Sequence, residues 1–258
     1  MLDEIVRRKE QEVAEAKARL PFAELKARLA RHAVERNFRA ALEVPGKLSL
    51  IAELKRKSPS RGMLRERFDP VSLAQTLEAA GAAALSVLTD EPYFGGHLDF
   101  LRDAKQFTQI PALRKDFILD PYQVYEAALY EADAVLLIVR ILSDAQLAAC
   151  LQAAQGLGLE PLVEVHAEEE LARAVRAGAR VIGINHRDLD TLTMDSDLSA
   201  RLMPKVPAGT VVVAESGVQT AEDVRRMRRL GVHAVLVGEA LMTAPDPAAK
   251  VRELFAGM

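Results

Sequence analysis

The chain has 258 residues, 50% of them hydrophobic, which suits one or two domains with a large core. Lys and Arg number 34 against 37 Asp and Glu, so the net charge of -3 excludes the global basic excess of many nucleic-acid-binding proteins. We find no apolar run long enough to span a membrane and no signal peptide, and the single cysteine, Cys150, suits a reducing compartment. We therefore expect a cytoplasmic protein.

The first 45 residues are predicted to be helical. They are charged and rich in alanine, with Ile5, Val13, Ala16 and Leu20 at roughly helical spacing. Pro21 is typical of the start of a second helix. Because this stretch contains no strand-like run, we interpret residues 1–45 as a helical extension that packs on the following domain.

From residue 48 onward, short apolar runs that favour β-structure alternate with helical stretches. Several helical stretches end at a glycine, as helix C-termini prefer, and an apolar run follows Gly81, Gly178 and Gly231. This pattern indicates a repeated βα unit. The predicted helices are 70–80, 121–130, 144–155, 167–177 and 221–230, and the predicted strands are 48–54, 84–88, 110–114, 134–139, 161–165, 181–184, 210–214 and 234–237.

Eight strands that alternate with helices predict parallel βαβ units, and eight such units close a (β/α)8 TIM barrel. The runs 134–139 and 211–213 are continuously apolar, as expected of strands that are buried on both faces. We predict a single α/β TIM-barrel domain over residues 1–258, with the helical extension included. The alternative is an open doubly wound sheet, but no Gly-x-Gly-x-x-Gly motif follows the first strand.

Polar residues follow most of the predicted strands. In barrel enzymes the carboxyl ends of the strands carry the chemistry. Glu53 and Lys55 stand two residues apart, so they share one face of the first strand; taken alone, they could be an ion pair at the rim of a sheet. The later strands end in Lys115 with Asp116, in Glu164, in Asn185 and in Glu215. Together these groups predict a site that transfers protons.

Two glycine turns predict a phosphate site. Ser216-Gly217 follows the seventh strand and Gly238-Glu239 the eighth, where barrels commonly bind phosphate. Glycine lets a phosphate approach backbone N–H groups, and a helix N-terminus adds favourable partial charge. Because a carboxylate repels phosphate, we expect only the backbone N–H of Glu239 to contribute and its side chain to turn outward.

The two lysines at strand ends, Lys55 and Lys115, are expected to lie near carboxylates, which would keep them charged. A charged lysine can act as a general acid or stabilise an oxyanion. A depressed pKa would instead favour a Schiff base. The sequence leaves both possibilities open.

Six motifs resemble, in order, those of the indole-3-glycerol-phosphate synthase family. The match spans residues 48–243, and the N-terminal helices fit the extension of that family. Arg114, directly before Lys115, differs from the residue types that are usual at this position in the family. The most specific motifs are 51–60 (IAELKRKSPS) and 214–217 (AESG), and the others are 86–90 (SVLTD) with 93–96 (YFGG), 114–118 (RKDFI), 161–166 (PLVEVH) and 183–189 (GINHRDL).

The resemblance implies a reaction in tryptophan biosynthesis. Enzymes of this family convert 1-(2-carboxyphenylamino)-1-deoxyribulose 5-phosphate to indole-3-glycerol phosphate, with loss of CO2 and water and without a cofactor. It implies that Lys115 protonates the substrate carbonyl for ring closure. Lys55 would hold the substrate carboxylate or the departing oxygen, and Glu164 would act as acid or base during dehydration. Glu53 would orient Lys55 or accept the last proton.

The resemblance also implies which residues bind the substrate. Asn185 and Glu215 would hold ribulose hydroxyls or position the lysines, and Arg187 would reach the substrate, unless it is a surface arginine at a helix start. The phosphate would be bound by Ser58, Ser216, Gly217, Gly238 and the backbone of Glu239. The aromatic ring would be held by Phe94, Phe117, Leu136, Ile138, Leu189 and Leu236, which without the resemblance are plain barrel core.

Other functions stay open: a phosphoribosylanthranilate isomerase, a Schiff-base aldolase, or a barrel subunit without activity. The isomerase gives no reason for two lysines or for extra N-terminal helices. A subunit without activity would not need four charged groups at the strand ends.

As partners we expect a small phosphorylated substrate, at most transient contact with other tryptophan-pathway enzymes, no nucleic acid and no membrane, and a monomer rather than an oligomer. No metal site is predicted, because no metal-ligand spacing is formed by His32, His97, His166, His186 and His233.

Overall fold

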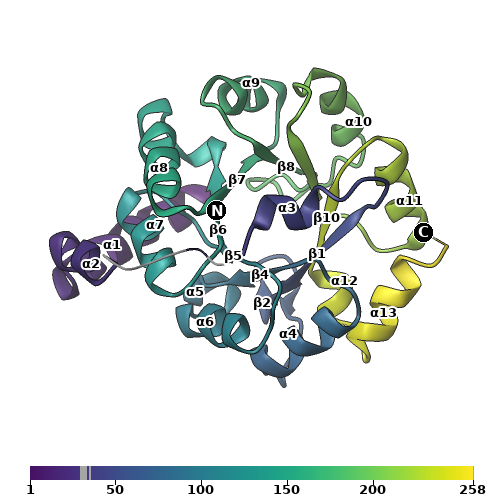
Figure 1. The fold of residues 1–258 in the computed structure, drawn as a ribbon, viewed down its shortest axis with the longest axis horizontal. Helices are drawn as coiled ribbons and strands as arrows, with labels where there is room; N and C mark the ends of the chain where they lie inside the picture. Colours follow the sequence, from purple (N-terminus) through teal and green to yellow (C-terminus); the bar gives the residue numbers. More distant parts are fainter. Residues whose placement is uncertain (30–33, 35, 258) are drawn as a thin grey trace.

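The computed structural model describes residues 1–29, 34 and 36–257, and it contains a closed barrel of eight parallel strands surrounded by helices (Figure 1). The strand order around the barrel is β1-β10-β9-β8-β7-β6-β5-β4. Because β1 pairs with both β4 and β10, the sheet has no open edge, which confirms the predicted TIM barrel and excludes the doubly wound alternative. The strands are β1 (Ser49–Leu54), β4 (Ala84–Leu88), β5 (Ala112–Lys115), β6 (Ala134–Ile138), β7 (Glu160–Val165), β8 (Val181–Asn185), β9 (Val211–Glu215) and β10 (Ala234–Val237).

The predicted helices are also present, with ends within two residues of those expected. Side chains that accept backbone N–H groups begin several of them, for example Asp69 before α4 and Thr220 before α11. A small antiparallel pair, β2 (Lys57–Ser58) and β3 (Gly62–Met63), lies in the loop after β1. The helices around the barrel are α4 (Pro70–Ala79), α5 (Glu91–Phe94), α6 (Leu98–Gln106), α7 (Pro121–Leu129), α8 (Asp144–Leu157), α9 (Glu168–Arg176), α10 (Leu198–Leu202), α11 (Ala221–Arg229), α12 (Glu239–Met242) and α13 (Pro247–Leu254), with 3-10 turns at Val139–Ile141 and Met203–Lys205.

Alternate strand residues face two separate cores. Along β1, Leu50, Ala52 and Leu54 belong to the apolar layer between the strands and the helices, whereas Ile51 belongs to the interior of the barrel. Glu53 continues the inward-facing series, so its carboxylate points into the barrel near the carboxyl end of the strand. The strand period therefore decides which polar side chains reach the interior.

The N-terminal extension forms three helices, α1 (Leu2–Arg19), α2 (Phe22–Arg28) and α3 (Phe38–Leu42), where two were expected. α3 lies against the start of the barrel: Ser49 Oγ, on the first residue of β1, donates to the backbone carbonyl of Leu42 at 3.3 Å, and Phe38 and Leu42 belong to the interior core. Five residues are too few to show a helical period, which explains why α3 was not predicted. Residues 30–33 and 35 of the predicted extension lie outside the described residues.

α1 packs on α7, and Figure 1 marks the N-terminus close to β6. α2 packs on the same helix α7, where Phe22 contacts Tyr125 with ring centroids 4.9 Å apart. Within the described ranges, no helix combines the length and apolar character needed to cross a membrane.

Candidate active site

A cavity opens at the carboxyl ends of the barrel strands. The structure brings all the site residues predicted from the sequence into its lining: Glu53, Lys55, Ser58, Phe94, Lys115, Phe117, Leu136, Ile138, Glu164, Asn185, Arg187, Leu189, Glu215, Ser216, Gly217, Leu236, Gly238 and Glu239. They come from every strand of the barrel except β4, or from the segments that follow the strands, and the segment after β4 supplies Phe94. Parallel strands end at one edge of a barrel, which is why residues so distant in sequence meet here.

Lys115, at the end of β5, lies between two carboxylates. Its Nζ is 2.8 Å from Glu164 Oε2 and 3.0 Å from Glu215 Oε2. The lysine side chain is 14% exposed and both carboxylates are buried, so these charges interact with little screening by water. The prediction that Lys115 lies beside carboxylates is confirmed.

Protonation in this cluster is set by burial and by the neighbouring charges. Burial alone lowers the pKa of Lys115, but Glu164, Glu215 and Glu53 raise it above its ordinary value, so the ammonium stays charged. Burial and the nearby Glu164 raise the pKa of Glu215, despite the opposing effect of Lys115. For Glu164, Lys115 and His166 outweigh burial and hold the pKa well below its usual range. The cluster therefore pairs a proton donor with one carboxylate that binds a proton readily and one that does not.

Lys55 and Glu53 form a second pair in the cavity, with Lys55 Nζ 2.6 Å from Glu53 Oε2. The two side chains share a face as the strand spacing predicted. Gly238, at the end of β10, makes room for this pair: a Cβ atom at that position would lie 2.1 Å from Glu53 Oε2. Gly238 is therefore required for the carboxylate as well as for any approach of a ligand to its backbone.

A second inward-facing glycine makes room for Glu215. A Cβ atom on Gly183 of β8 would lie 2.0 Å from Glu215 Oε1, closer than any real contact. The sequence analysis missed this residue, because a glycine inside a strand indicates a close approach without saying which group approaches. Gly183 thus fixes the position of a carboxylate that contacts Lys115.

The Lys115 cluster continues outward through a histidine. His166 Nε2 lies 3.2 Å from Glu164 Oε1, and its Nδ1 lies 3.3 Å from Glu170 Oε2. Arg140 in turn contacts Glu170 at 2.9 Å. Burial lowers the pKa of His166, but its contacts with Glu164 and Glu170 outweigh burial and raise the pKa to about 9. A charged imidazole therefore holds the Glu164 oxygen that does not face Lys115.

The predicted phosphate end of the cavity follows β9. Ser216 is a non-glycine residue with φ of +61°, in the left-handed region, and Gly217 follows with φ of +82°. Such a conformation at a serine costs of order 1–3 kcal/mol and is typical of functional sites. Asn185 Oδ1 accepts hydrogen bonds from Ser216 Oγ at 2.8 Å and from the backbone N–H of Arg187 at 3.1 Å. The Asn185 carbonyl thus joins the loops after β8 and β9, and its NH2 group is left to donate elsewhere.

The expectation that the Glu239 side chain turns outward is wrong. That side chain is 18% exposed, and its carboxylate lies 2.8 Å from Arg61 Nη2 and 3.7 Å from Arg187 Nη2. Arg61 belongs to the loop after β1 and Arg187 to the loop after β8. The sequence does not show that these two arginines lie beside Glu239. Their positive charges keep the carboxylate turned inward, where it links the two loops.

One wall of the cavity is aromatic and is partly covered by the N-terminal helix. The rings of Phe94 and Phe117 have centroids 6.1 Å apart. Leu2 and Ile5 of α1 are buried in the same interior cluster as Phe117 and also line the cavity. The sequence analysis predicted that the extension packs on the barrel but did not place these two residues in the site. Their spacing of three marks a buried helix face, yet it cannot show what that face covers.

The described residues contain no group of three or more His, Cys, Asp or Glu side chains that could hold a metal ion. His32 lies outside the described residues. Cys150 is buried in α8, away from the cavity lining, and burial raises the pKa of its thiol to about 12. It is therefore a structural residue and not a nucleophile.

Fold and site together define a (β/α)8-barrel enzyme with lysine–carboxylate pairs at the carboxyl ends of its strands. The family model described as "Indole-3-glycerol phosphate synthase" matches residues 2–254. The chain is 44% identical to the indole-3-glycerol phosphate synthase of Carboxydothermus hydrogenoformans, covering 99% of each chain, and 47% identical to that of Roseiflexus castenholzii, covering 98% of this chain and 97% of the relative. The chain belongs to the indole-3-glycerol phosphate synthase family, as the sequence motifs predicted.

Solved structures of other barrel enzymes share the fold. A crystal structure of 3-hexulose-6-phosphate synthase superposes with a TM-score of 0.65 at 19% identity, covering 81% of this chain and 99% of that one. The 3-hexulose-6-phosphate synthase from Salmonella typhimurium superposes with a TM-score of 0.61 at 16% identity, covering 80% and 96%. At these identities the similarity concerns the barrel and not the chemistry.

Proposed function

We propose that this protein is an indole-3-glycerol-phosphate synthase that converts 1-(2-carboxyphenylamino)-1-deoxyribulose 5-phosphate to indole-3-glycerol phosphate, CO2 and water. The observation that carries the proposal is the position of Lys115 Nζ, within 3.0 Å of Glu164 and Glu215 inside the cavity that also holds the Glu53–Lys55 pair. Membership of the family supports the same substrate.

Ring closure needs a proton on the substrate carbonyl. Lys115 donates that proton as the ring carbon that bears the carboxyl group attacks the carbonyl carbon, and departure of CO2 returns the bonding electrons to the ring. Its raised pKa keeps the lysine protonated before the reaction. Glu215 can return a proton to Lys115, because burial beside Glu164 raises the pKa of Glu215. A donor with its own proton supply next to it suits repeated turnover.

Dehydration needs an acid for the departing hydroxyl and a base for the last proton. Glu164 contacts Lys115 and His166 and lines the cavity, where it acts as acid or base. Lys55 holds the substrate carboxylate or the departing oxygen, and Glu53 orients that lysine through their 2.6 Å contact. The NH2 group of Asn185 donates to a ribulose hydroxyl.

The substrate phosphate is bound at the end of the cavity formed by Ser216, Gly217 and Gly238, with Ser58 on the opposite loop. Left-handed backbone at Ser216 and Gly217 leaves space for an anion to approach main-chain N–H groups. Arg187 adds a positive charge there. Phe94, Phe117, Leu136, Ile138, Leu189 and Leu236 hold the aromatic ring.

A Schiff-base aldolase is less well supported by the same geometry. A nucleophilic lysine needs a lowered pKa, whereas the surrounding carboxylates raise the pKa of Lys115. Failure of borohydride to trap the protein with its substrate is therefore expected. Trapping of Lys115 would reverse this choice.

Turnover of the purified chain tests the proposal. The chain contains no tryptophan, so the fluorescence of the indole product can be followed without a tryptophan background from the protein. We expect product without added metal or nucleotide, and unchanged rates with a chelator. Activity that a chelator removes and a metal restores would contradict the absence of a cofactor. We also propose that the enzyme acts in the cytoplasm and that it is a monomer. Gel filtration at working concentration tests the oligomeric state.

A further inference from the structure

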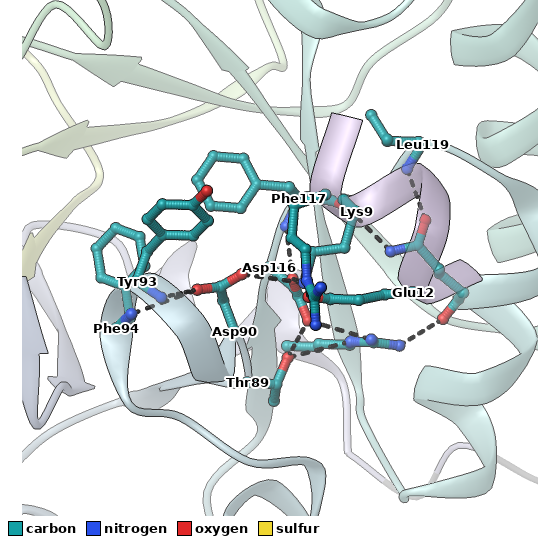
Figure 2. Close-up of polar contacts among 12 residues, drawn as sticks. Lys9, Glu12, Thr89, Asp90, Tyr93, Phe94, Asp116, Phe117 and Leu119 are labelled. Carbon is teal, nitrogen blue, oxygen red and sulfur yellow. Dashed lines mark hydrogen bonds and ion pairs between the residues drawn. The ribbon is translucent and has the colours of Figure 1, made fainter. Parts of the chain in front are cut away.

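A buried lysine of the N-terminal helix lies just outside the cavity and has no part in the reaction steps above. The Lys9 side chain is 5% exposed, and its Nζ lies 2.7 Å from Glu12, 3.0 Å from Asp90 and 2.9 Å from Asp116 (Figure 2). Glu12 is one turn along α1, but Asp90 follows β4 and Asp116 follows β5. The ammonium therefore joins α1 to two active-site loops.

Asp116 directly follows Lys115 and is held on all sides. Its Oδ1 accepts a hydrogen bond from the backbone N–H of Phe117 at 2.8 Å, and its Oδ2 accepts hydrogen bonds from Thr89 Oγ1 at 2.5 Å and from Arg114 Nη2 at 3.1 Å. With Lys9 added, this carboxylate fixes the turn at which the chain leaves Lys115 (Figure 2). Arg114, the departure from the family pattern, is thus part of the same buried cluster.

Asp90 fixes the other loop. Its Oδ1 accepts the backbone N–H groups of Tyr93 at 2.9 Å and Phe94 at 3.3 Å, so it caps the short helix α5. Its Oδ2 faces Lys9. The Asp90 and Asp116 carboxylates are 1% and 2% exposed, and without the ammonium between them they would repel each other in a site with little water.

Each of the two loops carries one phenylalanine of the aromatic wall. Phe94 ends α5, Phe117 follows Asp116, and their rings are neighbours in the cavity. Figure 2 shows both rings beside the carboxylates that contact Lys9. A shift of either loop would therefore move the wall, and a shift of the second loop would also move Lys115.

We propose that Lys9 is a positioning residue of the active site: by bridging Asp90 and Asp116 it holds Phe94, Phe117 and Lys115 in the geometry needed for ring closure. This inference rests on the proposed function for its kinetic test. It makes α1 part of the active site through a charged contact as well as through the apolar cover of Leu2 and Ile5.

The first test is Lys9→Met, with Lys17→Met as the matched control. Lys17 lies on the same helix and contacts Asp120 at 2.7 Å, but the lysine is 40% exposed and neither residue lines the cavity. Displacement of reacting groups by about 1 Å costs roughly a hundredfold in rate, so kcat should fall about tenfold to a hundredfold in Lys9→Met. Lys17→Met should keep the parent kcat. The rise in Tm with inorganic phosphate should persist in both variants, because Ser216 and Gly217 do not contact this cluster.

Hydrogen exchange gives a readout that does not depend on activity. The amides of Tyr93, Phe94 and Phe117 donate to the two carboxylates that Lys9 bridges, so they should exchange faster in Lys9→Met and at the parent rate in Lys17→Met. An inactive parent would end the proposed function and leave this measurement to decide whether Lys9 holds the loops.

A second variant keeps the test decisive if Lys9→Met folds poorly. Lys9→Gln combined with Asp90→Asn removes one charge of each sign, so Tm should return toward the parent value. Because Gln is one bond shorter than Lys, it cannot span both loops, and kcat should stay at least tenfold low. A parent-like kcat in either Lys9→Met or the stable double variant, with unchanged exchange of the three amides, would overturn the proposal.

Discussion

Two lysines at this end of the barrel, the buried Lys9 and the partly buried Lys115, each contact more than one carboxylate, but those carboxylates differ in their other partners. Beside Lys9, Asp116 and Asp90 also accept backbone N–H groups. Beside Lys115, the carboxylate of Glu215 accepts no backbone N–H within the described chain, and its Oε1 has no hydrogen-bond partner there. Asp116 is thus held by the main chain as well as by Lys9, whereas Glu215 is held mainly by Lys115.

This difference separates a contact that fixes structure from one that can react. Burial raises the pKa of an aspartate, but Lys9 and Arg114 outweigh it and lower the pKa of Asp116, which stays charged. At Glu215, burial and Glu164 outweigh Lys115 and raise the pKa. The buried Oε1 of Glu215 can accept a proton or a substrate hydroxyl, whereas both oxygens of Asp116 already accept hydrogen bonds and have no free lone pair to offer.

The largest expected effect is that of Lys115→Met. The variant keeps much of the side chain and removes the proton donor, so kcat should fall at least about a thousandfold. Glu215 can take up a proton when the ammonium is lost, so the protein should fold with a lowered Tm. Steady-state kinetics and a melting curve measure both. The smaller loss expected for Lys9→Met sharpens the comparison, and a kcat within tenfold of the parent would remove Lys115 from the role of general acid.

Gly183→Ala tests the geometry of the Lys115 cluster without changing its charge. The new methyl group would lie 2.0 Å from Glu215 Oε1, so the carboxylate must move away from Lys115. We expect kcat to fall roughly a hundredfold. Gly156→Ala in α8 is the control, because its Cβ would meet nothing within 4 Å, and it should keep full activity. Equal kinetics for the two variants would show that the position of Glu215 is unimportant.

His166 should make stability depend on pH. Its pKa is raised from 6.5 to about 9 in the folded protein, so the folded state binds this proton more tightly than the unfolded chain. The contribution is complete below pH 6.5 and is lost as pH rises through 9. We expect Tm to fall by on the order of 5 °C across this window, and by less in His166→Gln. His97→Gln, at a position 43% exposed, is the control; the same slope in all three proteins would contradict the contacts with Glu164 and Glu170.

The smallest effect concerns the phosphate end, which should act independently of both lysines. Inorganic phosphate at about ten times its Kd should raise Tm by roughly 3 °C through mass action. Gly217→Asp should abolish this rise, whereas Gly217→Asn should keep part of it. Both side chains tolerate the left-handed conformation at φ of +82°, so the pair isolates the effect of charge. An unchanged rise with Asp at this position would remove the phosphate assignment.

Much of the site could be predicted because the barrel turns sequence position into spatial position. A period of two places Glu53 and Lys55 on one face of β1, and the parallel strands bring Lys115, Glu164 and Glu215 to the same opening. These are short-range rules applied strand by strand. These rules therefore predict the position of a side chain even when none of its long-range contacts is known.

The sequence by itself determined the barrel, the order of its strands along the chain and many of the residues that line its cavity. Only the tertiary structure decided what those residues touch. A lysine at position 9 falls in the buried face formed by Leu2, Ile5 and Val13, a visible irregularity, but its partners Asp90 and Asp116 lie far along the chain. Helical and strand periods state which face is buried, whereas the group that covers it is set by packing between distant segments, and no local period contains that information.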